Sequence, residues 1–134
     1  MERSTRQRAA IRSVIGAAGR PLSPQEVLDA AQAQVPGIGF ATIYRNLKLL
    51  VDAGDLTPVS LPGESPRYEA AAPGHHHHFQ CLTCKRVFEV HGCPGDMLRL
   101  APDGFTVESH ELTLYGRCDE CPAPRGTPRA RRPG

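Results

Sequence analysis

The sequence of 134 residues is 40% hydrophobic, which is enough for one modest core or for two small domains. No apolar run approaches the length of a membrane span, and the first six residues lead into no signal-peptide core, so we expect a cytoplasmic protein that does not bind a membrane. Four of the five cysteines form two Cys-x-x-Cys pairs, and in a chain without a secretion signal this spacing favours metal binding over disulfides.

The net charge of +2 hides a segregation along the chain. Residues 1–54 carry a net charge of +3, residues 55–121 carry −5, and residues 122–134 carry +4. A basic N-terminal part is typical of contact with a polyanion, and an acidic middle part suits a cation site. An ordinary solvated surface is the alternative interpretation of both regions.

Three helices are predicted in the N-terminal part. The apolar residues between positions 11 and 18 follow the spacing of one helix face. The next helix has a clear start, with Ser23 as the N-cap, Pro24 at the first helical position and Glu26 completing a capping box. A third helix is predicted over residues 40–51, again with a periodic apolar face.

A hairpin after these helices predicts a winged helix-turn-helix domain. Residues 56–60 and 67–69 read as strands on either side of a turn at 62–65, which contains Pro and Gly. In such a domain the second helix of the motif enters the major groove of DNA and presents its N-terminal residues to the base edges.

Three side chains near the start of the third predicted helix can reach DNA: Thr42, Tyr44 and Arg45. Tyr44 is suited to a thymine methyl group, and Arg45 is suited to a phosphate or a guanine. The alternative is that Tyr44 is half-buried in a small helical core.

Four consecutive histidines precede the first cysteine pair. Alternate residues of a strand point to opposite faces, so we expect His76 and His78 on one face and His75 and His77 on the other. The run is either part of a metal site or a solvated polar strand that binds metal adventitiously.

The two cysteine pairs predict a structural metal site. Cys81 and Cys84 with Cys118 and Cys121 can offer four thiolates to one zinc ion in a closed tetrahedral shell. The second pair begins 34 positions after Cys84, more than the roughly 15–20 of common zinc ribbons, so the intervening chain must form structure of its own. A redox-active Cys-x-x-Cys is the alternative, but nothing around these pairs resembles the thioredoxin context.

The chain between the cysteine pairs predicts a small α+β domain. Residues 88–90, 105–108 and 111–115 read as strands, and residues 96–100 allow a short helix. Residues 122–134 contain too many Pro, Gly and Arg to pack, so we expect a disordered basic tail that either adds nonspecific phosphate attraction or has no role.

Three features together resemble the ferric-uptake-regulator (Fur) family of bacterial metal-responsive transcription factors. They are the segment Gly-Phe-Ala-Thr-Ile-Tyr-Arg-Asn-Leu at 39–47, the histidines before Cys81, and the ending His-Glu-Leu-Thr-Leu-Tyr-Gly-Arg-Cys-x-x-Cys at 110–121. The likeness extends over most of the chain between Thr5 and Cys121, in the family's order. It implies a homodimer on a palindromic operator in double-stranded DNA.

The resemblance also implies a division into domains. We expect a winged-helix DNA-binding domain over residues 1–72 and an α/β dimerisation and metal-binding domain over residues 73–121, with the tail at 122–134. Tyr44 matches the base-contacting tyrosine of the family, Arg45 matches a neighbouring contact, and residues 5–8 match the region that approaches the minor groove and backbone. The expected DNA-binding residues are Arg6, Arg8, Thr42, Tyr44, Arg45 and Lys48.

By the same resemblance, a regulatory metal is held by four residues: Glu69, His76, His78 and Glu89. Two imidazoles and two carboxylates form a borderline-hard set that suits manganese, iron(II) or zinc. Glu69 lies where the two domains join, so an ion shared between Glu69 and the histidines would fix the relative orientation of the domains.

A further metal site is expected on the opposite face of the histidine strand. Its residues are His75, His77, Asp96 and His110. Because the segment around Asp96 is short, Cys93 or His91 is an alternative fourth ligand, and Cys93 would favour zinc because thiolates prefer softer ions. A buried Cys93 without a role is the other interpretation.

The chain departs from the family pattern in two places. Many members carry a histidine ligand just before the second helix, where this chain has Pro21, which leaves Glu69 alone to couple the domains and casts doubt on peroxide sensing. The segment between Glu89 and His110 is a few residues shorter than in the family, so we expect a shortened helix at the dimer interface.

The sequence therefore predicts a metal-dependent repressor of metal-uptake and homeostasis genes, with manganese or iron favoured ahead of zinc as the sensed metal and with a separate structural zinc ion. It predicts neither an enzyme nor a small-molecule substrate. Two alternatives stand beside it. One is a peroxide- or redox-sensing repressor that works through Cys84 or Cys93. The other is a zinc hydrolase or deaminase, whose His-Glu-x-x-His and deaminase signatures the sequence lacks.

Overall fold

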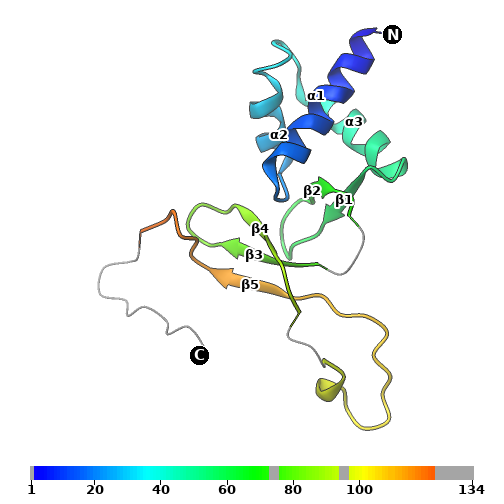
Figure 1. The fold of residues 1–134 in the computed structure, drawn as a ribbon, viewed down its shortest axis with the longest axis vertical. Helices are drawn as coiled ribbons and strands as arrows, with labels where there is room; N and C mark the ends of the chain where they lie inside the picture. The colour runs from blue at the N-terminus through cyan, green and yellow to red at the C-terminus, as the bar shows by residue number, and fades with distance from the viewer. Residues whose placement is uncertain (1, 73–75, 94–96, 123–134) are drawn as a thin grey trace.

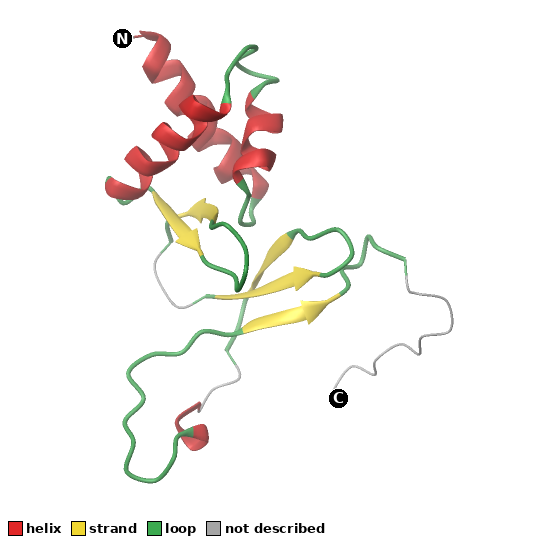
Figure 2. Ribbon diagram, turned by 180° about the vertical axis from the view of Figure 1, so that it is seen from behind, coloured by secondary structure: helices red, strands yellow, loops and turns green. Residues whose placement is uncertain are grey.

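The computed structural model describes residues 2–72, 76–93 and 97–122. Three helices lie at the N-terminal end, a two-stranded hairpin follows, and a three-stranded sheet with a long connection lies beyond the hairpin (Figure 1). The same succession is visible from behind (Figure 2). The expected α+β class is confirmed. The tail predicted at 122–134 lies outside the described residues except for Pro122.

The three helices are α1 (Glu2–Ala18), α2 (Pro24–Ala31) and α3 (Phe40–Asp52). Helix α1 extends toward the N-terminus well beyond the predicted stretch, because Arg, Gln and Ala are good helix formers that need no apolar partner. No helix in the described part of the chain combines the length and the apolar character that crossing a bilayer requires.

The start of α2 has the predicted capping box. The backbone N–H of Glu26 donates to Oγ of Ser23 over 3.2 Å, and the backbone N–H of Ser23 donates to Oε1 of Glu26 over 3.1 Å. Ahead of α2, helix α1 is terminated by Gly19, which follows its last residue and has a φ of +65°, a conformation that glycine adopts without strain. The two signals set the short connection between α1 and α2.

One hydrophobic cluster joins the three helices to the hairpin. Its most buried members come from all three helices and are each at most 2% exposed: Ile11, Ile15, Val27, Ala31, Ile43, Leu47 and Leu50. Burial of such side chains is the main stabilising contribution to a domain of this size, at roughly 1.5–3 kcal/mol each. The helix faces predicted from periodicity are therefore the ones that pack.

The hairpin consists of β1 (Leu56–Val59) and β2 (Arg67–Ala70), which pair antiparallel as predicted. A contact that the sequence does not predict joins the hairpin to the helices. The backbones of Leu22 and Tyr68 exchange two hydrogen bonds of 2.8 Å, so the loop ahead of α2 pairs with the hairpin. Helices α1 to α3 and strands β1 and β2 form the winged-helix domain.

The second domain is built on β3 (His77–Cys81), β4 (Val87–Val90) and β5 (Thr113–Gly116), in the order β4-β3-β5. Strand β4 runs antiparallel to β3, whereas β5 runs parallel to it. A parallel neighbour requires a crossover connection, and residues 91–112 provide it. This unit is the sheet domain.

The crossover differs from the prediction. Residues 105–108 do not form a strand, because no described strand pairs with them and Phe105 is 71% exposed. The predicted helix is a single 3-10 turn, η1 (Met97–Leu100). Figures 1 and 2 show this segment extending away from the sheet as a long loop. Apolar alternation alone was therefore misleading here.

Candidate metal centres and nucleic-acid interface

The two cysteine pairs meet at one end of the sheet domain. Cys81 ends β3 and lies beside Gly116, the last residue of β5, so the parallel pairing of these strands brings Cys118 and Cys121 to the first pair. The Sγ–Sγ distances are 3.7 Å for Cys81–Cys121, 3.8 Å for Cys84–Cys118 and 3.6 Å for Cys118–Cys121. A zinc ion about 2.3 Å from four sulfurs would separate them by about 3.8 Å. The cluster therefore fits tetrahedral zinc.

The surroundings favour the thiolates of Cys81 and Cys84 but disfavour the thiolate of Cys121. The backbone N–H groups of Cys84 and Cys118 each donate to Sγ of Cys81 over 3.4 Å and lower the pKa of Cys81 to about 5. Nε of Arg86 donates to Sγ of Cys84 over 3.2 Å and lowers the pKa of Cys84. Burial raises the pKa of Cys121 to about 12. A cation among the sulfurs is what allows all four to ionise together.

A second cluster lies at the junction of the two domains. Glu69 comes from β2, His78 from β3 and Glu89 from β4, and His78 and Glu89 are opposite each other in the strand register. Nε2 of His78 is 3.3 Å from Oε2 of Glu69 and 3.8 Å from Oε1 of Glu89. Nδ1 of His76 is 3.6 Å from Oε2 of Glu89. The four predicted regulatory ligands thus converge, with His76 at the edge.

This junction cluster has the features of a cation site. The side chains of Glu69, His78 and Glu89 are between 11% and 16% exposed, so two carboxylates face one imidazole with little water. Nε2 of His76 and Oε2 of Glu89 are buried without a hydrogen-bond partner among the described residues. Buried polar atoms of this kind are costly unless something satisfies them. A divalent cation fits the donor set.

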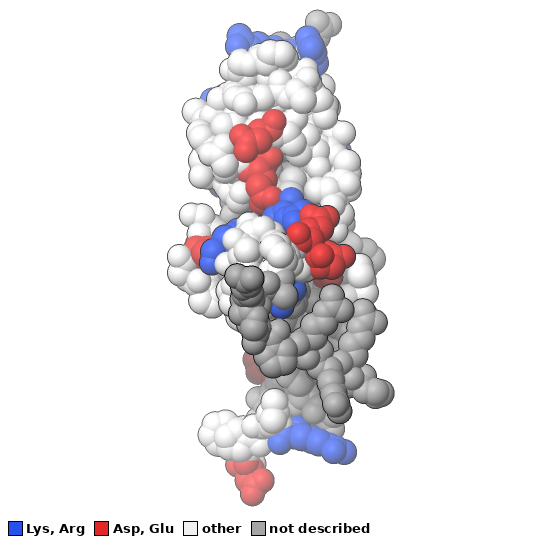
Figure 3. Space-filling view, turned by 90° about the vertical axis from the view of Figure 1, so that its left-hand side faces the viewer, with Lys and Arg blue, Asp and Glu red and all other residues white. Residues whose placement is uncertain are grey.

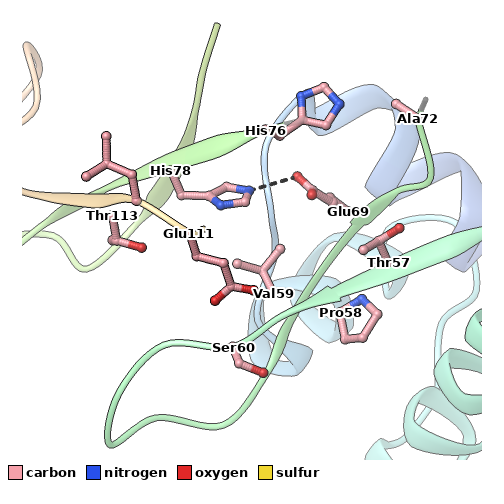
Figure 4. A pocket seen from close by; sticks show the side chains of 11 residues that line it. Thr57, Pro58, Val59, Ser60, Glu69, Ala72, His76, His78, Glu111 and Thr113 are labelled. Atoms are coloured by element: carbon pink, nitrogen blue, oxygen red, sulfur yellow. Dashed lines mark hydrogen bonds and ion pairs between the residues drawn. The ribbon is translucent and has the colours of Figure 1, made fainter. Parts of the chain in front are cut away.

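A pocket at the junction contains one residue that the sequence reasoning missed. Glu111 lines the same pocket as Glu69, His76 and His78 (Figure 4). It lies just before β5, and the backbone N–H of His78 donates to the carbonyl of Leu112 over 3.1 Å, which brings Glu111 close to the histidine strand. The feature that could have indicated Glu111 is its position directly ahead of β5, the strand that pairs with β3. Pro21, at the position of the family histidine, is buried and offers no ligand atom.

A third cluster is formed by His77, Cys93 and His110, on the other face of β3. Sγ of Cys93 is 3.4 Å from Nε2 of His110, and the rings of His77 and His110 stack with their centroids 5.1 Å apart. The backbone N–H of Leu112 donates to Nδ1 of His77 over 3.2 Å and holds that ring in place. Cys93 therefore joins the two histidines.

Of the other residues considered for this third site, the structure describes only His91. His91 is exposed and does not belong to a cluster of ligands among the described residues. His75 and Asp96 lie outside the described residues.

The residues expected at DNA lie on the exposed sides of α1 and α3. Tyr44 is 52% exposed, and its ring lies 6.2 Å from that of Phe40. Arg45 contacts Oγ1 of Thr42 over 3.4 Å. Tyr44 does not belong to the buried core of the helices. Figure 3 shows basic side chains at the N-terminal end of the molecule and both acidic and basic ones lower down.

The remaining basic residues of this set differ in their contacts. Nε of Arg8 donates to Oδ1 of Asn46 over 3.3 Å, which places this arginine of α1 against α3. Nζ of Lys48 forms an exposed ion pair with Asp52 over 3.1 Å, and Arg6 is exposed. An exposed pair of this kind contributes little to stability, so Lys48 can exchange Asp52 for a phosphate at low cost.

Comparisons with known proteins agree with this arrangement. The sequence model of the "Ferric uptake regulator family" matches residues 2–115. The ferric uptake regulation protein of Staphylococcus aureus is 39% identical over 98 residues, which cover 72% of this chain and 69% of that protein. The protein of the same description from Bordetella parapertussis is 36% identical over 105 residues, which cover 76% of each. Among solved structures, a zinc-bound manganese uptake regulator is 28% identical with a TM-score of 0.73, over 84% of this chain and 87% of that one.

Proposed function

Because this chain belongs to the ferric uptake regulator family, we propose that it is a repressor whose binding to double-stranded operator DNA depends on a divalent metal ion. Membership makes the chain a metal-responsive transcription regulator and not an enzyme. The genes that we assign to its control are those of metal uptake and homeostasis, and we assign its action to the cytoplasm.

The observation that carries this proposal is the convergence at the junction. Glu69 belongs to the winged-helix domain, whereas His78 and Glu89 belong to the sheet domain, and their ligand atoms lie within 4.8 Å of one another. A bound divalent ion would supply the positive charge that offsets the repulsion between the two carboxylates. The residues that would hold it are Glu69, His76, His78 and Glu89.

Glu69 is connected to the DNA-binding helices through backbone contacts. It precedes Ala70 in β2, and its neighbour Tyr68 is hydrogen-bonded to Leu22 ahead of α2. Fixing the carboxylate of Glu69 against His78 therefore fixes the hairpin and the helices that pack on it. The junction cluster then sets the orientation of α3 toward DNA. Metal shifts the population of domain orientations toward the orientation that binds the ion more tightly, to the extent that the orientations differ in metal affinity.

The cysteine cluster has a separate, structural role in this proposal. Zinc held by Cys81, Cys84, Cys118 and Cys121 would join the end of β3 to the end of β5. The sheet domain has three short strands and few fully buried apolar side chains among its described residues, so its stability depends on this joint. We propose that this ion is permanent and that the junction ion is the one that is sensed.

We propose that the functional unit is a homodimer on a palindromic operator. Strand β5 has β3 as its only neighbour among the described strands, and it exposes Leu114 at 45% and Tyr115 at 49%. A free edge with apolar side chains is a surface that a second copy can cover in a two-fold arrangement. Sedimentation of the zinc-loaded protein should give the mass of a dimer, and a Leu114→Lys variant should give the mass of a monomer.

The donor set favours manganese or iron(II) as the sensed metal, with zinc next. Two carboxylates at the junction are hard ligands, and Glu111 lines the same pocket with a further carboxylate, so more oxygen ligands are at hand than a four-coordinate zinc site needs. The names of the relatives point in different directions, because two refer to ferric uptake and one to manganese uptake.

We further propose that His77, Cys93 and His110 hold a third ion. A thiolate with two imidazoles is a softer set than the one at the junction and would select zinc. The short Cys93–His110 distance of 3.4 Å supports a shared ligand in preference to an isolated cysteine.

The experiment that tests the proposal is a titration of DNA binding by metal. Duplexes would be selected from a random pool in the presence of each ion. Binding of these duplexes by the zinc-loaded protein would then be titrated with manganese, iron(II) and zinc in anaerobic buffer, with metal counted per chain. We expect one of these ions to raise the affinity at least tenfold, at one added ion per chain. Equal affinity with and without every ion would refute metal-dependent repression.

A further inference from the structure

The ring of Phe88 in β4 contacts two arginines that come from different domains. The guanidinium carbon of Arg20, in the loop before α2, is 5.9 Å from the centre of the Phe88 ring. The guanidinium carbon of Arg86, just ahead of β4, is 5.5 Å from the same centre. Both distances lie within the range of a cation–π contact. One aromatic side chain therefore connects the winged-helix domain with the sheet domain.

On the sheet-domain side, this contact leads to the cysteine cluster. The guanidinium of Arg86 donates to Sγ of Cys84 over 3.2 Å and to Sγ of Cys118 over 3.7 Å, and it forms an ion pair with Glu120 over 2.6 Å. These contacts hold the guanidinium of Arg86 against the Phe88 ring. The position of Phe88 is thereby tied to an intact cysteine cluster.

On the winged-helix side, the contact leads to the start of α2. Nη2 of Arg20 forms an ion pair with Oε2 of Glu26 over 2.8 Å, and Nη1 of Arg67 forms an ion pair with Oε1 of Glu26 over 3.1 Å. Glu26 is also the acidic member of the capping box, so its side chain is held from several directions. The guanidinium of Arg20 is therefore fixed relative to α2 and β2.

A second contact between the domains lies near the first. Nε2 of Gln80, a β3 residue that is 3% exposed, donates to Oε2 of Glu64 in the hairpin turn over 2.8 Å. Nη2 of Arg67 reaches Oε1 of the same Glu64 over 3.4 Å. Both contacts between the domains thus end on one network of charged side chains, and neither includes a residue of the junction cluster.

We propose that the contacts Arg20–Phe88 and Glu64–Gln80 form an interdomain clasp that holds Glu69 opposite His78 and Glu89 without the help of an ion. Phe88 and Gln80 are then positioning residues for the regulatory site. Phe88 and Glu89 are adjacent in β4, so the strand that supplies a ligand on one face carries the clasp contact on the other. The proposal rests on the proposed function for the identity of the ligands.

The clasp predicts a measurable effect on metal affinity. If only a fraction of molecules presents Glu69 to the sheet domain, the apparent dissociation constant of the junction ion rises in inverse proportion to that fraction. Loss of one partly exposed cation–π contact would weaken binding by about two- to fivefold. Such a change removes none of the four cysteine ligands, because Phe88 is not one of them.

The test compares Phe88→Leu, Arg20→Gln and the double variant in the zinc-loaded full chain. Affinity for manganese would be measured by calorimetry, and the spread of domain orientations without manganese by small-angle scattering. We expect each single variant to bind manganese about two- to fivefold more weakly and to broaden the scattering distance distribution. The double variant should be no weaker than the weaker single variant. Phe105→Leu makes the same chemical change at an exposed loop position and should leave both measurements unchanged.

Several outcomes would overturn the clasp. Unchanged manganese affinity in both single variants would do so, and so would fully additive effects, since these would mean that Arg20 and Phe88 do not act through each other. If the Phe88→Leu variant loses zinc or unfolds, the test relies on Arg20→Gln alone. Wild-type manganese affinity in the Arg20→Gln variant then overturns the proposal. A failure of the proposed function is distinct, because manganese would then bind the wild type without changing its affinity for DNA.

Discussion

Glu69 and His78 face each other across the boundary between the two domains, with Oε2 of the glutamate 3.3 Å from Nε2 of the histidine. The first side chain belongs to the hairpin of the winged-helix domain, and the second belongs to the central strand of the sheet. Any group that binds both controls how the helices stand relative to the sheet.

Replacing Glu69 by alanine should abolish metal-stimulated DNA binding and leave the fold intact. Among the described residues, the carboxylate is the only ligand that the winged-helix domain contributes to the junction cluster, so its loss uncouples the domains even if an ion still binds His78 and Glu89. A gel-shift titration with manganese would measure this. Glu108→Ala removes an acid from an exposed loop position and serves as the control. Wild-type operator affinity in the Glu69 variant would contradict the role given to the junction.

Replacing Cys81 by serine should unfold the sheet domain and dissociate the dimer. Structural zinc contributes roughly 10–16 kcal/mol in small zinc domains, more than a small sheet can lose and remain folded. Metal counting and sedimentation would follow the loss of zinc and of mass. Cys93→Ser, at a cysteine outside this cluster, should keep the structural zinc and the dimer. A folded dimer of the Cys81 variant with full zinc content would refute the structural assignment.

Replacing Tyr44 by alanine should weaken operator binding by about 1–3 kcal/mol and relax the preference at one base position, with little change in stability because the ring is 52% exposed. Lys48→Ala provides the contrast. A phosphate contact carries no sequence information, so this variant should weaken binding to all duplexes alike and reduce the salt dependence by about one counterion. Binding at several salt concentrations separates the two effects, and identical behaviour of the variants would contradict the assignment.

Replacing Glu26 by glutamine should destabilise the winged-helix domain by about 1–2 kcal/mol at neutral pH. Burial tends to raise the pKa of Glu26, but the Ser23 amide and the guanidiniums of Arg20 and Arg67 outweigh it, so that the pKa lies below its usual value of 4.5. A lowered pKa in the folded state stabilises the fold above pH 4.5, and this contribution is lost as the pH falls through the lowered value.

The measurement for Glu26 is the difference in stability between wild type and variant as a function of pH. Zinc release in acid affects both proteins and cancels in that difference. Hydrogen exchange of the α2 amides would locate the effect. A difference that stays constant from pH 7 down to pH 3 would mean that the charge of Glu26 does not contribute.

Replacing Cys93 by serine should lower the number of metal ions bound per chain by one at saturating zinc. The thiolate is the softest donor of the third cluster, and two stacked histidines alone hold zinc weakly. With cobalt as the probe, the sulfur-to-metal charge-transfer absorption should fall by the share of one thiolate. His91→Ala is the control, because His91 is exposed and outside the cluster. An unchanged number of metal ions per chain would contradict the third metal site.

Local signals in the sequence were sufficient for the winged-helix domain. The capping box of Ser23 and Glu26 depends on residues three positions apart, and the hairpin depends on a short turn, so each can be recognised without knowledge of the rest of the fold. The cysteine pairs could be found in the same way, because their spacing is a chemical requirement of the metal. The pairing of Leu22 with Tyr68 joins residues far apart in sequence, and no periodicity announces it.

The parts that could not be predicted depend on which segments become neighbours. Apolar alternation at residues 105–108 satisfies the pattern of a strand, but a strand also needs a partner for its backbone, and none of the described strands pairs with this segment. The place of Glu111 in the junction pocket could not be predicted because it follows from the pairing of β5 with β3. The contact between Arg20 and Phe88 joins two domains through side chains that have no motif.

The parallel pairing of β3 with β5 has a consequence for how this protein can vary. The four clustered cysteines close a loop of chain, and residues 101–108 inside that loop form no strand with the described part of the sheet. Doubling the length of such a loop costs only about 0.6 kcal/mol in closure entropy. Insertions between residues 101 and 108, which lie outside all three ligand clusters, should therefore be tolerated, whereas a one-residue shift within β3 or β5 would send every side chain of the shifted strand to the wrong face of the sheet.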